Sequence, residues 1–389
     1  MVARIVIPLF LLIVLTDVYI DFQYLRKRKN LTWWQRLSWW TPTILLVLFT
    51  CVLASIKSFA PHNLTWLNTY LFLLGTIVGP KFLFTLFSIF GKGIQKFIVK
   101  TRKNYGEIVG FVIGTLFFCA YIYGFTFGFQ QIRVRHIEVV SDRLPRAFDG
   151  YRIIHVSDMH IGTFKGWREK ILKAEMDSIK SLKADQIFFT GDLQNMRPEE
   201  VEELAPLIKD AMKGTIAILG NHDYTEYVRL TPAEEKAQQE RLERVITQNL
   251  GWKLLKNSNA QLYFNNDSIA ICGGENDGRP PFPRKIDMAK TIRGINKAQF
   301  MIMLQHDPWA WRHDILPQTT ATLTLSGHTH GGQMQLFGLR PTMIRNTEDY
   351  GFYKEGTRYL NVTAGMGGLV PFRFNMPNEI VVITLRAKK

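Results

Sequence analysis

Two histidines, His328 and His330, stand one residue apart in the stretch LSGHTHGGQ, among glycine, serine and threonine residues that indicate a turn. A single histidine in a folded protein is more often a hydrogen-bonded polar residue than a metal ligand. Two imidazoles that follow an apolar run and lean to the same side of an extended segment favour a metal ion. Further ligands must then come from other parts of the chain.

The other candidate ligands share one feature: each directly follows a short apolar run rich in β-branched residues. Such runs predict buried strands, and helical patterns lie between them. The polar residues at the ends of these runs are Asp158, His160, Asp192, Asn221, His222, His306, His328 and His330. Alternating strands and helices predict an α/β domain with a mostly parallel sheet. Because ligands bind beyond the carboxyl ends of such strands, these residues are expected to converge.

The candidate set offers imidazole, carboxylate and amide donors and no thiolate. Nitrogen and oxygen donors suit Zn, Mn or Fe, and the absence of a cysteine ligand excludes a thiolate zinc cluster. A carboxylate can bridge two ions, and paired ions about 3.5–4 Å apart stabilise phosphoryl transfer and supply a hydroxide near neutral pH. A further histidine could protonate the leaving oxygen. Each motif alone could be a turn or a helix cap, but their joint occurrence at strand ends favours a metal centre.

The first third of the chain is far more apolar than the rest. Four stretches approach the roughly 20 residues that a membrane helix needs, namely residues 5–20, 42–56, 64–90 and 108–129. The first lacks a small-residue cleavage site and carries Asp17 and Asp21, so we interpret it as a retained span. An interfacial aromatic belt is indicated by four tryptophans, Trp33, Trp34, Trp39 and Trp40. The sequence therefore predicts an integral, multi-pass membrane protein with about four transmembrane helices.

Basic residues explain the formal net charge of +15 and predict the topology. They cluster beside the apolar spans, at residues 26–29 and 92–103, which favours a membrane topology over nucleic-acid binding. Short basic loops lie in the cytoplasm, so both termini and the later domain are expected on the outer side. Asp17 and Lys81 fall within apolar spans and could pair there, although snorkelling or shorter spans are alternatives.

Five blocks together resemble the calcineurin-like metallophosphoesterase family. They are Asp158-x-His160, Gly191-Asp192, Gly220-Asn221-His222-Asp223, His306 and Gly327-His328-Thr329-His330. The C-terminal stretch NVTAGMGG and the GGQ after His330 resemble its membrane-anchored bacterial branch. The resemblance implies two packed mixed β-sheets flanked by helices, in a domain at residues 151–389. A transmembrane region at 1–130 and a connector at 131–150 would precede it.

Carried over residue by residue, the resemblance implies two divalent metal ions, Mn, Fe or Zn. One ion would be held by Asp158, His160 and His330. The other would be held by Asn221, His306 and His328. Asp192 would bridge the two ions.

Two further residues receive roles at the expected site. The resemblance makes His222, beside the ligand Asn221, the general acid or a phosphate contact. Arg373, in PFRFN, is a candidate substrate contact because guanidinium groups bind phosphate, and a structural role at the surface is equally compatible.

The expected function is a membrane-bound phosphoesterase that hydrolyses phosphate esters or diesters through a metal-activated hydroxide at a two-metal centre. The short connector keeps the site near the bilayer, which favours a lipid-linked or envelope substrate. The expected partners are the lipid bilayer and the phosphoester, without nucleic acid; no oligomeric state is predicted. The alternative is a transporter or sensor whose extramembrane domain binds a phosphorylated ligand. His222 argues against it, because a binding module needs no leaving-group acid.

Overall fold

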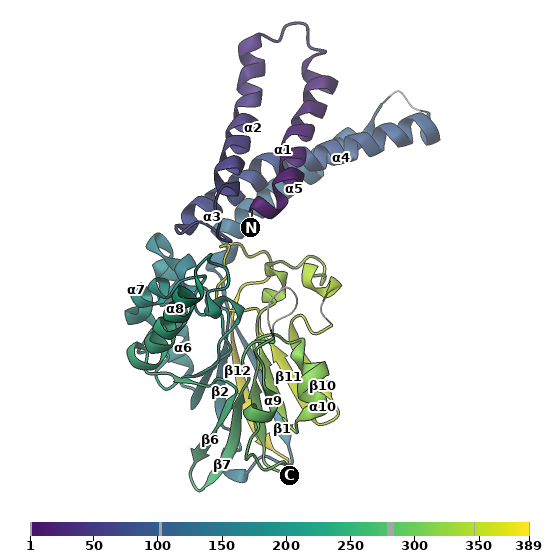
Figure 1. The fold of residues 1–389 in the computed structure, drawn as a ribbon. Helices are drawn as coiled ribbons and strands as arrows, with labels where there is room; N and C mark the ends of the chain where they lie inside the picture. The colour runs from purple at the N-terminus through teal and green to yellow at the C-terminus, as the bar shows by residue number, and fades with distance from the viewer. Residues whose placement is uncertain (1, 101–102, 278–283, 346, 389) are drawn as a thin grey trace. The chain divides into compact units, whose positions relative to one another are not determined.

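The computed structural model describes residues 2–100, 103–277, 284–345 and 347–388 (Figure 1). The chain divides into two compact units. Unit 1 comprises Met1–Phe127 and Tyr227–Arg229, and unit 2 comprises Gly128–Glu226 and Leu230–Lys389.

Unit 1 is helical. Its α-helices are α1 (Val6–Ile20), α2 (Trp33–Ala54), α3 (Leu64–Leu73), α4 (Gly79–Ile94) and α5 (Tyr105–Thr126). With the 3-10 and π turns that extend them, they form four candidate membrane spans, Val2–Leu25, Trp33–Ala54, Leu64–Val99 and Tyr105–Gln130. The predicted number of spans is confirmed. The third span continues through Pro80, which lies in the first turn of α4 directly after the π turn at Leu74–Val78.

Small residues let α4 and α5 pack closely. Gly106, Gly110 and Gly114 recur every four residues along α5. A Cβ atom added to Gly110 would lie 2.9 Å from the backbone oxygen of Phe84, and one added to Gly114 would lie 2.9 Å from that of Pro80. The two backbones therefore approach each other over a face that tolerates no larger side chain, as in many membrane helix pairs.

The two charges expected inside the spans meet as an ion pair. The Lys81 Nζ atom lies 2.9 Å from Asp17 Oδ1, and the Asp17 side chain is buried. The Thr43 hydroxyl donates a hydrogen bond to the same carboxylate. The ammonium group also lies 4.4 Å from the centre of the Trp39 ring. A charge within a bilayer is stable only when paired or hydrated, so this contact fixes α1, α2 and α4 together.

We predict that Lys81→Met destabilises the detergent-solubilised protein strongly, because removal of one partner leaves the Asp17 charge buried and unpaired. Breaking a buried pair costs about 3–5 kcal/mol, and the measurement is the midpoint of thermal unfolding. Lys57→Met, at an exposed position of the same unit, is the matched control. Exchanging the charges, as Asp17→Lys with Lys81→Asp, should recover part of the loss. Equal melting of K81M and K57M would show that the pair contributes nothing.

Unit 2 contains two six-stranded mixed sheets. The first, in order, is β1 (Ile132–Ser141), β12 (Asn378–Ala387), β2 (Arg152–Val156), β3 (Gln186–Phe189), β4 (Ile216–Ala217) and β5 (Lys253–Leu254). The second is β10 (Gly351–Glu355), β11 (Arg358–Val362), β9 (Leu323–Ser326), β8 (Met301–Leu304), β7 (Asp267–Gly273) and β6 (Ser258–Phe264). Strands β2 to β5 run parallel, as do β7, β8, β9 and β11. This is the expected fold of two mixed sheets with flanking helices.

Half of the segment at 131–150, which the sequence indicates as a connector, belongs to the first sheet. Strand β1 lies within it and pairs in parallel with β12 along its whole length. The sequence IRVRHIEVVS is rich in β-branched residues, as strands are, but it also carries several charges. Charged side chains are common on edge strands, and here they hide the apolar run by which the other strands are predicted. The ion pair between Arg135 Nε and Glu379 Oε1, at 3.1 Å, joins the two strands.

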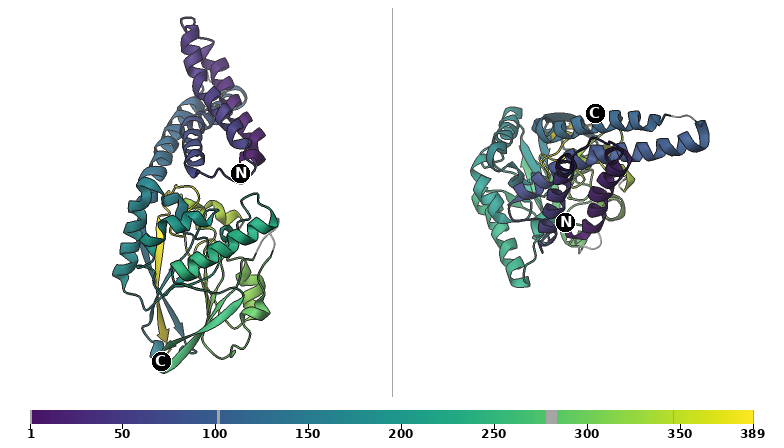
Figure 2. Two further views of the ribbon diagram at one scale, coloured as in Figure 1. Left: turned by 60° about the vertical axis from the view of Figure 1, so that its left-hand side comes forward. Right: turned by 90° about the horizontal axis from the view of Figure 1, so that it is seen from above.

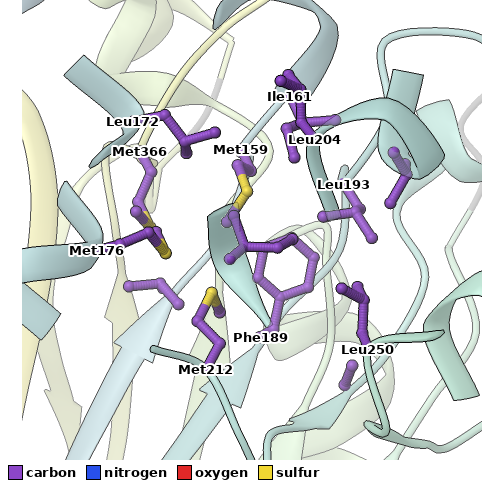
Figure 3. Packing of buried hydrophobic residues seen from close by; sticks show 14 of the residues in the cluster. Met159, Ile161, Leu172, Met176, Phe189, Leu193, Leu204, Met212, Leu250 and Met366 are labelled. Carbon is purple, nitrogen blue, oxygen red and sulfur yellow. The ribbon is translucent and has the colours of Figure 1, made fainter. Parts of the chain in front are cut away.

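Three apolar clusters hold unit 2 together. One lies between the sheets and includes Ile153, Ile218, Leu304 and Leu325. Another packs helices α6 (Glu169–Leu182), α7 (Pro198–Ile208) and α8 (Pro232–Arg244) against the first sheet, and Figures 1 and 2 show these helices grouped on one side. Figure 3 shows the interior of this cluster. The third cluster includes Trp311 and lies near the short helices α9 (Met288–Thr291) and α10 (Leu316–Gln318). The helices thus cover the sheets and leave the strand ends for the polar residues.

Candidate metal centre

The eight predicted metal and acid residues all follow parallel strands at their carboxyl ends. In the first sheet, β2 leads to Asp158 and His160, β3 to Asp192, and β4 to Asn221 and His222. In the second sheet, β8 leads to His306 and β9 to His328 and His330. Because strands of both sheets end at the same place, the structure brings these eight residues together, as the position of each motif predicts.

The first group of candidate ligands consists of Asp158, His160 and His330, whose potential ligand atoms all lie within 4.8 Å of one another. His330 Nε2 is 3.5 Å from Asp158 Oδ1. The two imidazole rings stack with their centres 5.1 Å apart. The Nδ1 atom of His330 is buried without a hydrogen-bond partner. A buried polar atom without a partner is unusual, and it fits an imidazole that serves as a metal ligand.

The second group consists of Asp192, His306 and His328, again with ligand atoms within 4.8 Å of one another. Asn221 belongs to it, because its Oδ1 atom lies 2.8 Å from His328 Nδ1 and 3.1 Å from His306 Nε2. Asp192 also reaches the first group. Its Oδ2 atom lies 3.3 Å from His306 Nε2 and 3.5 Å from His160 Nε2. One carboxylate is therefore shared by both groups.

Most of these candidate ligands adopt a left-handed backbone conformation that side chains other than glycine rarely take. The φ angles are 51° at Asp158, 44° at His160, 59° at Asp192, 69° at His328 and 52° at His330. Each such residue costs of the order of 1–3 kcal/mol and persists only where its surroundings impose it. Such clustered backbone strain is typical of a functional site rather than of an ordinary turn.

Asp223 is a site residue to which the sequence analysis gave no role. Its buried carboxylate accepts hydrogen bonds from the backbone N–H groups of Asp192 at 2.8 Å, Leu193 at 3.0 Å, Gln194 at 3.2 Å and Gly220 at 2.9 Å. It thus joins the segment after β3 to the segment after β4. Burial, together with the nearby Asp192 charge, raises the pKa of Asp223 to about 7.

Close approach explains two of the glycines in the motifs. A Cβ atom added to Gly327 would lie 2.1 Å from Asp158 Oδ2, and one added to Gly220 would lie 2.2 Å from Asp192 Oδ1. Both contacts are far shorter than van der Waals distance. The glycines therefore leave room for the two carboxylates on which the ligand groups are built.

His222 lies beside both groups and is only partly buried. Its Nδ1 atom is 2.6 Å from the carbonyl oxygen of Asn195, so Nδ1 carries the hydrogen and donates it. Its backbone N–H donates to Asp192 Oδ1 at 2.8 Å. The ring lies edge-on to His160 with the centres 4.7 Å apart. The imidazole is thus oriented toward the ligand groups and fixed in one tautomer.

The electrostatics of the site favour a bound cation. Burial and the neighbouring His222 lower the pKa of His160 to about 3, so its ring is neutral and keeps a lone pair for a metal. Burial alone would raise the pKa of Asp192, but nearby imidazoles hold it well below its usual range. Burial lowers the pKa of His306, yet the Asp192 carboxylate outweighs this and raises it to about 10. Without a metal, a protonated His306 supplies the positive charge that the buried Asp192 carboxylate requires, and a bound divalent ion would take over this role as His306 loses its proton.

Arg373 does not lie where a substrate contact was expected. Its side chain is completely buried, and it donates hydrogen bonds to the carbonyl oxygens of Ala364 at 2.8 Å, Gly365 at 3.2 Å and Gly367. The Gly367 N–H in turn donates to the Asp158 carbonyl oxygen at 2.9 Å. Since its guanidinium binds backbone carbonyls, Arg373 acts on the loop that supports Asp158 and presents no surface to a phosphate.

Comparison with known proteins agrees with this geometry. Residues 3–129 match the family described as a probable calcineurin-like phosphoesterase, transmembrane domain. Residues 151–332 match the calcineurin-like phosphoesterase family. The matched ranges contain the four spans, apart from Val2 and Gln130 at their outer ends, and every residue of the two ligand groups.

Several curated relatives are similar over most of their length. The uncharacterised metallophosphoesterase YkuE of Bacillus subtilis is 28% identical over 276 residues, which are 66% of this chain and 87% of the relative. A Helicobacter pylori metallophosphoesterase is 28% identical over 320 residues, 79% of each chain.

A third relative has an assigned reaction. The UDP-2,3-diacylglucosamine pyrophosphatase LpxG of Chlamydia trachomatis is 26% identical over 296 residues, 62% of this chain and 86% of the relative. Together the two family matches and these relatives favour an enzyme over a transporter or sensor. The chain is a membrane-anchored phosphoesterase of the calcineurin-like metallophosphoesterase family.

Proposed function

We propose that this protein hydrolyses phosphate esters or diesters at a centre of two divalent ions. The observation that carries the proposal is the shared carboxylate of Asp192, which lies between the two ligand groups. One ion would be held by Asp158, His160 and His330, and the other by Asn221, His306 and His328. Asp192 would bridge them. Nitrogen and oxygen donors without thiolate are compatible with Mn, Fe or Zn.

The chain's own residues supply orientation and a proton. Divalent ions bound here would lower the pKa of a coordinated water and offset the charge of the phosphoryl group. Asp223 holds the Asp192 segment in place through four backbone hydrogen bonds. The Asn195 carbonyl accepts the Nδ1 hydrogen of His222, so in the doubly protonated ring the Nε2 hydrogen is the one that would pass to the leaving oxygen, and the neutral Nδ1–H form would remain. His222 is therefore the proposed general acid.

We predict that His222→Ala lowers kcat for an aryl phosphodiester with Mn by roughly 10²–10⁴-fold, the usual contribution of a general acid. Metal content, measured by elemental analysis, should stay unchanged, because His222 is not assigned as a ligand. His136→Ala, at an exposed position of strand β1, is the matched control. Wild-type protein treated with a chelator should lose activity and recover it when Mn is restored.

Two outcomes would contradict this assignment. If H222A loses metal together with activity, His222 is a ligand rather than an acid. If wild-type protein hydrolyses no phosphoester with Mn, Fe or Zn, the proposed reaction fails.

We further propose that the substrate is a lipid-linked phosphoester or pyrophosphate. Only Gln131 separates the last candidate span, which ends at Gln130, from strand β1, which begins at Ile132. One residue extends by at most about 3.6 Å, so the first strand starts close to the membrane. The relative LpxG is named for a lipid nucleotide, UDP-2,3-diacylglucosamine. Both points favour a substrate that is presented by the bilayer.

A substrate panel tests this class. The protein is placed in phospholipid vesicles with Mn, and kcat/KM is measured for each substrate. We expect kcat/KM for a vesicle-embedded lipid diphosphate or phospholipid to exceed that for a soluble nucleotide about tenfold or more. A tenfold ratio corresponds to about 1.4 kcal/mol in the activation barrier. The reason is that the tether raises the concentration of bilayer substrates near the site. Faster turnover of the soluble nucleotide would rule out a lipid preference.

The distribution of basic residues supports an outer-side location for the catalytic unit. We predict that a cysteine introduced at Lys388, in a cysteine-free background, reacts with an impermeant thiol reagent in intact cells. A cysteine at Lys100, the exposed basic residue directly after the third span, should react only after the membrane is permeabilised. The opposite labelling pattern would reverse the topology.

A further inference from the structure

An exposed apolar loop directly follows the last ligand segment. Residues 334–344 have the sequence MQLFGLRPTMI and begin four positions after His330. Six large apolar side chains there are exposed: Met334 37%, Leu336 49%, Phe337 95%, Leu339 69%, Met343 47% and Ile344 88%. Single exposed apolar residues are normal, but contiguous groups of this kind mark interaction surfaces.

The tip of this loop is held in an unfavourable conformation. Leu336 and Leu339 each donate a backbone hydrogen bond to the other, at 3.0 and 2.9 Å, and so close a two-residue turn. The turn residues Phe337 and Gly338 have φ angles of 50° and 83°. A turn with two positive φ angles prefers Asn-Gly, because asparagine tolerates the left-handed region and phenylalanine does not. An almost fully exposed Phe337 at this position therefore incurs both backbone strain and the cost of apolar exposure.

The loop is nevertheless anchored, and its anchor also contacts the candidate metal centre. The buried Asp349 carboxylate accepts hydrogen bonds from Arg340 Nε at 2.7 Å and Thr342 Oγ1 at 2.9 Å. The Asp349 carbonyl oxygen accepts one from the hydroxyl of Thr329, the residue between His328 and His330. Gln335 N–H donates to the Phe374 carbonyl oxygen at 2.9 Å. The exposed side chains are thus presented at a fixed position relative to the ligands.

We propose that residues 334–344 are a membrane-docking loop, which inserts Phe337, Leu339 and Ile344 into the bilayer interface beside the metal centre. The surface goes beyond the proposed function, while its consequence for a lipid substrate rests on that function. Docking would hold the entrance of the site against the leaflet that presents the phosphoester. It would also remove the apolar tip from water.

The bilayer is the partner because of the chemistry of the loop and the anchorage of the chain. Residues 334–345 combine large apolar side chains with two arginines and contain no acidic residue. Arg340 is bound to Asp349, whereas Arg345 is exposed next to Ile344 and suits a lipid phosphate. Apolar and basic residues together are typical of interfacial segments that bind anionic lipid. A protein that carries four candidate membrane spans is never far from such a surface.

The position of the loop is tested on the full chain in vesicles of phosphatidylglycerol and phosphatidylcholine. In a cysteine-free background, Phe337→Cys carries an environment-sensitive fluorophore. We expect a blue-shifted emission and quenching by a lipid with a quencher on its acyl chain. Tyr263→Cys is the matched control and should show neither effect. Tyr263 is a 73% exposed aromatic residue, the last but one of strand β6. Emission from position 337 equal to that from position 263 would overturn the proposal.

The functional consequence is tested with the triple variant Phe337→Ser, Leu339→Ser and Ile344→Ser. Its kcat/KM for a vesicle-embedded lipid diphosphate should fall about tenfold or more, whereas kcat/KM for a soluble aryl phosphodiester and the Mn content should not change. Tyr263→Ser is the control. An equal loss on both substrates would show that the loop merely supports the site, which contradicts docking. Quenching at position 337 without any lipid hydrolysis by wild-type protein would refute the lipid substrate while supporting the docking surface.

Discussion

The carboxylate of Asp192 is the interaction on which the rest of the site depends. One of its oxygens lies 3.3 Å from His306 Nε2 and 3.5 Å from His160 Nε2, and the other accepts the His222 N–H at 2.8 Å. A buried anion is stable only when hydrogen bonds and a positive charge compensate it. The backbone of Asp192 is itself held in a left-handed conformation, and Asp223 accepts its N–H. The surrounding segments therefore have to be placed so that this one anion is compensated.

The fold meets this requirement by separating two tasks. The apolar clusters between and outside the sheets hold the strands and involve none of the ligands. Local hydrogen bonds at the strand ends then fix each ligand, for example His328 N–H to Asp158 at 3.0 Å. A core substitution would change stability, whereas a change at the strand ends would change ligand geometry. This separation lets a parallel-stranded fold position a charged site at the strand ends, outside its apolar clusters.

The sequence alone predicted those features of the site and of the spans whose signal lies within a short stretch of the chain. The ligands were predictable because each follows an apolar run, and the Asp17–Lys81 pair because an isolated charge in a membrane is costly. The role of Asp223 could not be predicted, because the backbone N–H groups that it binds, at residues 192–194, lie some 30 positions earlier in the chain. Arg373 was expected near phosphate, and only the packing of the 364–367 loop shows that carbonyl groups surround it. Strand β1 was missed because its partner, β12, is the last strand of the chain.

The segment after strand β9 concentrates two unfavourable features that the described part of the chain does not offset by itself. His328 and His330 have left-handed backbones, and His330 Nδ1 is buried without a hydrogen-bond partner. Phe337, a few residues later, has the same strained backbone and is almost fully exposed. Divalent ions would offset the first cost and a bilayer the second. Because Asp349 joins the loop to Thr329, between the two histidines, contact with the membrane and the geometry of the metal centre are mechanically linked in one short segment.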